Sequence, residues 1–125
     1  MVSQITQWTL DVRDTDRMAE FWSRVLGYRV EKGDDGCAKL YPPDDAPPGT
    51  LTVWLQRVDA SKAGKNRNHP DLNPTDGDVE AEVERLLALG ARHTDVGQTD
   101  ADPFVVLADP EGNEFCVLRN RTREV

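Results

Sequence analysis

The chain has 125 residues, with 23 acidic against 15 basic ones, and its formal net charge is -8. This length suits one domain with a modest core. The acidic balance argues against nucleic acid and anionic membrane surfaces as partners, because both attract clustered lysine and arginine. No apolar run approaches the roughly 20 residues of a membrane-spanning helix. The first residues lack the regions of a secretory signal, so we expect a cytoplasmic protein with free thiols at Cys37 and Cys116.

The first half of the chain begins with a strand and a helix. Residues Ile5–Val12 alternate apolar and polar side chains, which predicts a strand with Gln7 on its polar face. Apolar residues at helical spacing then predict an amphipathic helix over Asp14–Leu26. An aspartate at its start can cap it, and Gly27 can end it in a left-handed conformation.

Three further strands complete this half. Tyr28–Glu31 and Cys37–Tyr41 are predicted to form a hairpin across a Gly-Asp-Asp-Gly turn. Residues Leu51–Val58 alternate again, so Trp54 and Gln56 should share a polar face. An aromatic ring on such a face can form a flat platform for a ligand, although a core or dimer-interface tryptophan fits equally well.

The second half repeats this order with shorter strands. His69–Leu72 is predicted to be a short strand interrupted by a proline. A helix should follow the cap at Asp78 and end at Gly90, and Ala91–Asp95 should lead into the next strand. The closing segment Phe104–Leu118 should be a hairpin.

The closing hairpin turns at D-P-E-G-N, in which proline fixes φ and glycine accepts a positive φ. In the second strand of the hairpin, Glu114 and Cys116 should lie on one face, opposite Phe115 and Val117. A carboxylate and a thiol on one face suggest a lined cavity. The alternative is a solvent-facing edge with one buried thiol.

An internal repeat organises the whole chain. R-V-L-G-Y-R at Arg24–Arg29 parallels L-A-L-G-A-R at Leu87–Arg92, and each half reads β-α-β-β-β. The sequence therefore predicts an α+β fold in which two βαβββ modules, about residues 1–60 and 66–125, form a single domain.

Three motifs in order give this chain a resemblance to the vicinal oxygen chelate superfamily, which includes glyoxalase-like, bleomycin-resistance and dioxygenase proteins. They are F-W-S-R-V-L-G-Y at Phe21–Tyr28, K-N-R-N-H-P-D-L at Lys65–Leu72 and D-P-E-G-N-E-F at Asp109–Phe115. The resemblance covers nearly the whole chain. It implies two modules curled around one cavity that binds a small molecule.

The resemblance also implies where a metal site would lie. Metal-dependent members place histidine or glutamate on the first, fourth, fifth and eighth strands, and these positions fall on Gln7, near Gln56, on His69 and on Cys116. Only His69 is of the expected ligand type, and carboxamides are weak neutral donors. We therefore expect no metal ligands and no cofactor. The alternative is a divalent ion with an altered set of ligands, in which Glu114 could take the place of Cys116.

We expect a ligand-binding pocket lined by residues from both halves, namely Gln7, Trp54, Gln56, His69, Cys116 and Glu114. Strand alternation puts Asp71 on the face of His69, where it could orient the imidazole ring. His69 is accordingly the one candidate catalytic residue, either as a general base or as a hydrogen-bonding anchor. Cys116 without a neighbouring base is expected to act as a small apolar side chain.

The leading functional hypothesis is a glyoxalase-like protein with an incomplete metal site that binds or sequesters a small organic ligand. One alternative is a metal-dependent lyase, isomerase or dioxygenase of the same superfamily. Another is a non-catalytic dimeric module. A homodimer is expected, because relatives with two modules per chain usually pair and a short chain leaves sheet edges to protect. The alternative is a monomer, in which the prolines of Pro42–Pro48 blunt an edge.

Overall fold

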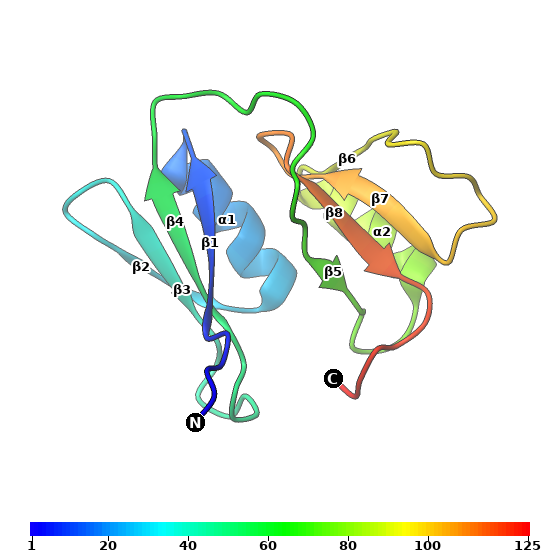
Figure 1. Ribbon diagram of the computed structural model, residues 1–125, viewed down its shortest axis with the longest axis horizontal. Coiled ribbons are helices and arrows are strands. Elements are labelled where there is room, and N and C mark those ends of the chain that lie inside the picture. The colour runs from blue at the N-terminus through cyan, green and yellow to red at the C-terminus, as the bar shows by residue number, and fades with distance from the viewer. The chain divides into compact units, whose positions relative to one another are not determined.

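Two four-stranded sheets, each accompanied by one helix, make up the structure, a computed structural model that describes residues 1–125 (Figure 1). The chain divides into two units, Met1–Ser61 and Lys62–Val125. Both units run strand, helix, then three strands. The α+β fold of two βαβββ modules predicted from the internal repeat is confirmed.

The first unit contains a sheet with the strand order β1-β4-β3-β2. Strands β1 and β4 are parallel, and the other neighbours are antiparallel. The elements are β1 (Gln7–Val12), α1 (Thr15–Leu26), β2 (Arg29–Lys32), β3 (Ala38–Tyr41) and β4 (Thr52–Arg57).

The second unit repeats this topology with the order β5-β8-β7-β6, and β5 and β8 are its parallel pair. Its elements are β5 (Asp71–Leu72), α2 (Val79–Leu89), β6 (Arg92–His93), β7 (Phe104–Ala108) and β8 (Glu114–Leu118). Strand β5 is shorter than the sequence predicts. Pro70 has no N–H to donate to a ladder, although its carbonyl accepts a hydrogen bond from the Cys116 N–H at 3.1 Å.

Helix α1 forms as the sequence predicts. Its cap is Asp14, whose carboxylate accepts a hydrogen bond from the Arg17 N–H at 3.1 Å. Its end is Gly27, with φ of 72°. The rings of Phe21 and Trp22 lie edge to face, 5.1 Å apart, and both are buried. These aromatic residues therefore belong to the core, where such pairs add to the apolar contact.

Strand alternation separates core from surface in the first unit, as expected. Val53 and Leu55 of β4 are buried, whereas Trp54 between them is half-buried and Gln56 is exposed. On β1, Gln7 is exposed. The polar face of this sheet thus carries the carboxamides and the indole that the sequence placed there.

The second unit buries its helix and hairpin against each other. Asp78 caps α2 by accepting a hydrogen bond from the Ala81 N–H at 3.0 Å. Leu86 of α2 and the alternating residues Phe115 and Val117 of β8 are fully buried. Cys116, on the other face of β8, is also buried, at 7% exposure.

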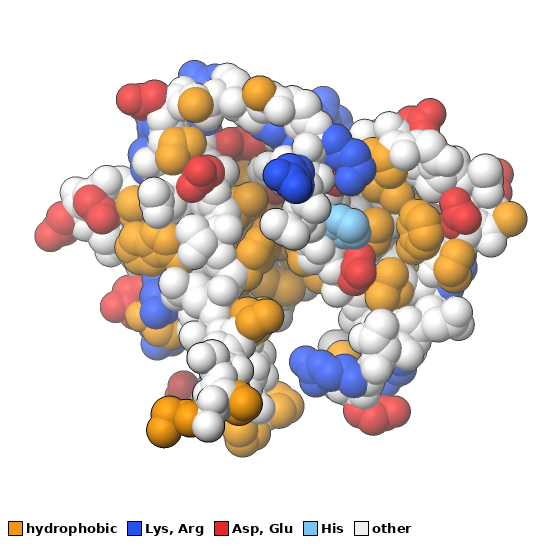
Figure 2. Space-filling view, in the orientation of Figure 1, with side chains coloured by type: hydrophobic (Ala, Val, Ile, Leu, Met, Phe, Trp, Pro, Cys, Tyr) orange, Lys and Arg blue, Asp and Glu red, His pale blue; other side chains and the backbone are white.

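The surface carries charges of both signs. Basic and acidic side chains are interspersed over the face drawn in Figure 2. Neither helix is long and apolar enough to span a membrane. Each sheet has two edge strands with one unpaired side, β1 and β2 in one sheet and β5 and β6 in the other. The homodimer stays a prediction.

The half-buried hydroxyl of Tyr28 gives a test of the first unit. The Tyr28 hydroxyl donates to the Leu51 carbonyl at 2.6 Å, and burial raises the pKa of Tyr28 above its ordinary value of 10.0. Because the folded state keeps the phenol protonated, the stability it contributes is complete below pH 10.0 and is lost as the pH rises through the raised pKa. We predict that Tyr28→Phe costs about 1 kcal/mol in urea unfolding near neutral pH.

The same variant should also flatten the alkaline fall in stability, since it removes the titrating group. Tyr41→Phe is the matched control, because Tyr41 is the other tyrosine of the chain and the variant keeps Tyr28. The prediction is wrong if the two variants show the same alkaline profile.

Candidate functional site

Three side chains with metal-ligand chemistry meet where β5 pairs with β8. Asp71 lies directly opposite Cys116 in the parallel register, and His69 precedes Asp71 by two residues, on the same face. The ligand atoms of the three residues all lie within 4.8 Å of one another. The site is therefore built by one strand pair within the second unit.

Asp71 is the centre of this group. Its Oδ1 lies 3.2 Å from Nε2 of His69, and its carboxylate also hydrogen-bonds the Cys116 thiol. Burial and the neighbouring Asp71 raise the pKa of Cys116, while the charge of Lys65 opposes the shift. Cys116 is thus a protonated thiol in the absence of a metal, and it is not an activated nucleophile.

The burial of the group suits an open binding site. Cys116 is buried, whereas the side chains of His69 and Asp71 are 37% and 48% exposed. A ligand can therefore reach the imidazole and carboxylate from solvent, with the thiol at the base of the group.

The D-P-E-G-N turn beside the site is held by a buried carboxylate. Asp109 is fully buried, and its carboxylate accepts hydrogen bonds from the N–H groups of Glu111 and Asn113 at 3.0 and 2.9 Å. The Asn113 side chain donates to both of its oxygens. Gly112 closes the turn with φ of 88°, as the sequence predicts.

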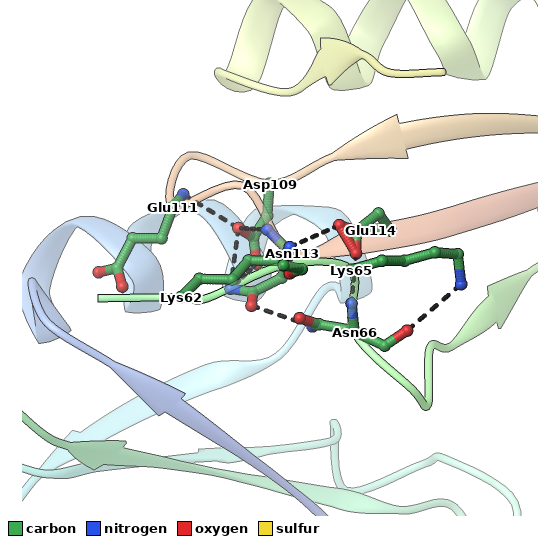
Figure 3. A network of polar contacts seen from close by, with 8 residues as sticks. Lys62, Lys65, Asn66, Asp109, Glu111, Asn113 and Glu114 are labelled. Carbon is green, nitrogen blue, oxygen red and sulfur yellow. Dashed lines mark hydrogen bonds and ion pairs between the residues drawn. The ribbon is translucent and has the colours of Figure 1, made fainter. Parts of the chain in front are cut away.

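The D-P-E-G-N turn and Glu114 also bind the segment from Lys62 to Asn66, which precedes His69 (Figure 3). The Asn66 side chain donates to Oδ1 of Asn113 at 3.0 Å, and the Asn66 N–H donates to Oε1 of Glu114 at 2.7 Å. Lys62 pairs with the other Glu114 oxygen at 2.9 Å. These contacts hold the segment preceding His69 against the start of β8.

Glu114 therefore has a different environment from the one expected of a pocket residue. Burial raises the pKa of Glu114, but the hydrogen bonds from Lys62 and Asn66 outweigh it, so that its pKa is lowered overall. Both carboxylate oxygens have partners, and Glu114 is not a member of the His69 group. Here it anchors the chain.

The other predicted pocket residues belong to the first unit. Gln7 accepts a hydrogen bond from the Thr52 hydroxyl at 3.0 Å, and Trp54 and Gln56 lie on the same face of the sheet as Gln7. The structure thus brings together His69 and Cys116, adds Asp71, and keeps Gln7, Trp54 and Gln56 on the corresponding face of the first sheet.

The correspondence of the two sheets follows from their registers. The internal repeat matches Arg29 of β2 to Arg92 of β6. When the pairings are followed from these residues across each sheet, Trp54 of β4 takes the position that Cys116 has in β8. The parallel pairs then match Thr9 to Asp71 and, two residues earlier, Gln7 to His69. The register thus places Trp54, rather than Gln56, at the position equivalent to Cys116.

Comparison with protein families identifies the fold. A model of the glyoxalase-like domain matches residues 7–118. The chain belongs to this family. The resemblance to the vicinal oxygen chelate superfamily is thereby confirmed. No curated protein matches the chain in sequence.

Solved structures of the same fold are distant in sequence. The fosfomycin resistance protein FosX from Mesorhizobium loti is 18% identical, with a TM-score of 0.74 over 98% of this chain and 95% of that chain. FosX from Listeria monocytogenes, in complex with Mn(II) and sulfate, is 17% identical, with a TM-score of 0.73 over 98% and 94%.

A glyoxalase/bleomycin resistance protein/dioxygenase family enzyme from Burkholderia phytofirmans is also 17% identical, with a TM-score of 0.66 over 92% of this chain and 97% of that chain. At these identities the likeness to solved structures shows the fold.

The prediction that the protein has no cofactor is wrong. A structural neighbour is solved with Mn(II), and this chain has a three-residue group of metal-ligand type in His69, Asp71 and Cys116. The prediction considered four family positions one by one. It did not consider that Asp71, opposite Cys116 in the ladder, supplies a third donor.

Asp71 is the residue that sequence reasoning left out of its pocket. The signal available was strand alternation, which put Asp71 on the face of His69. Its proximity to Cys116 depends on the register of β5 against β8, which no local pattern contains.

The turn network gives a test of how firmly the site is supported. We predict that Asn113→Ala destabilises the protein by about 2–3 kcal/mol, because the buried Asp109 carboxylate loses donors and Asn66 loses its acceptor. The measurement is urea unfolding of variant and wild type.

Asn120→Ala is the matched control, since Asn120 is an exposed asparagine near the end of the chain. Equal unfolding midpoints for the two variants would show that the network contributes little.

Proposed function

We propose that this protein binds a small organic ligand at the exposed side of the β5–β8 pair, together with a divalent metal ion held by His69, Asp71 and Cys116. The observation that carries the proposal is the convergence of an imidazole, a carboxylate and a thiol within 4.8 Å.

The donor set fits a metal ion. Around a tetrahedral zinc ion with bonds of about 2.0–2.3 Å, neighbouring ligand atoms lie roughly 3.3–3.8 Å apart, so that small side-chain rotations from the present spacing suffice. Nitrogen and sulfur donors favour zinc over the harder Mn²⁺ and Mg²⁺. Metal uptake would replace the thiol proton of Cys116 and its hydrogen bond with Asp71.

All three residues donate to the ion in this proposal. His69 and Asp71 provide the two exposed donors, and Cys116 provides a donor at the buried base. A bound divalent ion would supply a Lewis-acid position for an oxygen or nitrogen atom of the ligand. The hydrogen bonds of Asn66 with Glu114 and Asn113 hold the segment that precedes His69.

A metal-dependent enzyme of the superfamily is the second candidate. The specific observation in its favour is that the chain offers three ligands with two of them exposed, since catalytic zinc sites keep a coordination position open whereas structural ones are closed. Turnover of a bound compound would distinguish this candidate from binding or sequestration.

We predict that calorimetric titration with Zn²⁺ shows about one equivalent bound per chain, more tightly than Mn²⁺, because the donor set is of the softer type. His69→Ala, Asp71→Asn and Cys116→Ser should each weaken Zn²⁺ binding about tenfold or more, since each removes one donor.

His93→Ala is the matched control, because His93 is the other histidine and lies on β6, outside the group. The proposed metal site fails if His93→Ala weakens Zn²⁺ binding as much as His69→Ala does, or if the three ligand variants bind like the wild type.

We predict that a thermal-shift screen of the zinc-loaded protein finds a stabilising compound among aromatic and antibiotic-like molecules, with fosfomycin included because of the structural neighbours. A compound at about 100 times its Kd adds about 2.7 kcal/mol and raises the melting temperature by about 10 °C.

Cys116→Ser should abolish this shift, and Cys37→Ser, which alters the other buried thiol, should retain it. A shift of equal size in both variants would place the ligand elsewhere. Chemical conversion of the stabilising compound would favour the enzyme over the binding protein.

A further inference from the structure

A second cavity lies within the second unit and shares no residue with the His69 group. Its volume is about 420 Å³. Its lining residues lie on one face of α2, on the strands β6 and β7, in the loop that joins these strands, and at Arg119 after β8. This volume falls in the range of small-molecule pockets, roughly 300–1,000 Å³.

The wall from α2 consists of Glu80, Val83 and Glu84, which are three and four residues apart and so share one face of the helix. Opposite them is the half-buried side chain of Val105 from β7, which pairs with Val117 on the sheet face that packs against α2. The cavity therefore combines apolar side chains from the helix and the sheet with carboxylates at its edge.

The loop on the rim is ordered by its own hydrogen bonds. The Gln98 side chain donates to the Thr94 carbonyl at 2.7 Å and accepts from the Val96 N–H at 2.8 Å. The Thr99 N–H donates to the Asp102 carboxylate at 2.8 Å. Because these contacts exist without a ligand, less ordering has to accompany binding.

The charges of the cavity are not balanced. Arg119 is held by Glu80 at 2.5 Å, and these two charges largely cancel. Glu84 and Asp100 line the same cavity and form no ion pair. Two exposed carboxylates without an ion-pair partner therefore line the cavity, together with His93.

We propose that this cavity is a second binding site, which takes a small organic cation with an apolar ring or chain. The ammonium or guanidinium group of such a ligand pairs with Glu84 and Asp100. Its apolar part covers Val83 and Val105. The net charge of -8 favours the approach of a cation.

Three probes of one shape and different charge test the proposal. They are benzylamine, which is cationic, benzyl alcohol, which is neutral, and benzoate, which is anionic. In a titration followed by NMR, benzylamine should bind most tightly and shift the resonances of residues that line the cavity. Raising the salt concentration should weaken it, because the carboxylates are exposed.

Charge-neutralising variants identify the groups responsible. Glu84→Gln and Asp100→Asn should each weaken benzylamine binding about threefold, as expected for exposed ion pairs. Asp45→Asn removes the same charge from an exposed loop of the first unit and should leave the affinity unchanged. Thr99→Trp places a large side chain on the exposed rim and should reduce binding in a protein that still folds.

Either of two results would overturn the proposal. One is equal binding of benzylamine, benzyl alcohol and benzoate, which would exclude a role for charge. The other is wild-type affinity for benzylamine in the double variant Glu84→Gln, Asp100→Asn. Both results are independent of Zn²⁺, so they leave the His69 group untouched.

Discussion

A buried carboxylate is the constraint on which the second unit depends. Asp109 is fully buried, and burying an ionised carboxylate costs several kcal/mol unless donors surround it. Those donors are backbone N–H groups of its own turn and the Asn113 side chain. The turn has to adopt the conformation that supplies them. Asn113 is then placed to bind Asn66, and the chain from Asn66 leads directly to His69.

Most of the fold could be predicted because it follows from local periodicity. The alternation in β4 placed Val53 and Leu55 in the core and Trp54 on the opposite face, and the structure agrees. Glycine and aspartate marked the ends of α1 for steric and capping reasons. The strands β5 and β6 were harder to delimit, because two residues carry too little periodicity.

The site was predicted less completely because its contacts are distant in sequence. His69 and Cys116 were found through a family pattern, but their distance from each other depends on the parallel register of β5 and β8. The partners of Glu114 lie on a connecting segment, where no periodic pattern operates, so its anchoring role could not be foreseen. The second cavity combines a helix face with a loop, and its two carboxylates without an ion-pair partner look in the sequence like ordinary surface charges.

The two units carry different chemistry on equivalent positions. Register matches His69 and Cys116 to Gln7 and Trp54, so that strong metal ligands occur in one unit and a carboxamide and an indole in the other. The proposed metal ion would then take all its protein ligands from β5, its approach and β8. Strand β5 is only two residues long and adds few ladder hydrogen bonds. An ion bound there would cross-link it to β8, and the free energy of binding would add to the stability of the second unit. In this way the residues that bind the ion also strengthen one of the two shortest strand pairings of their sheet.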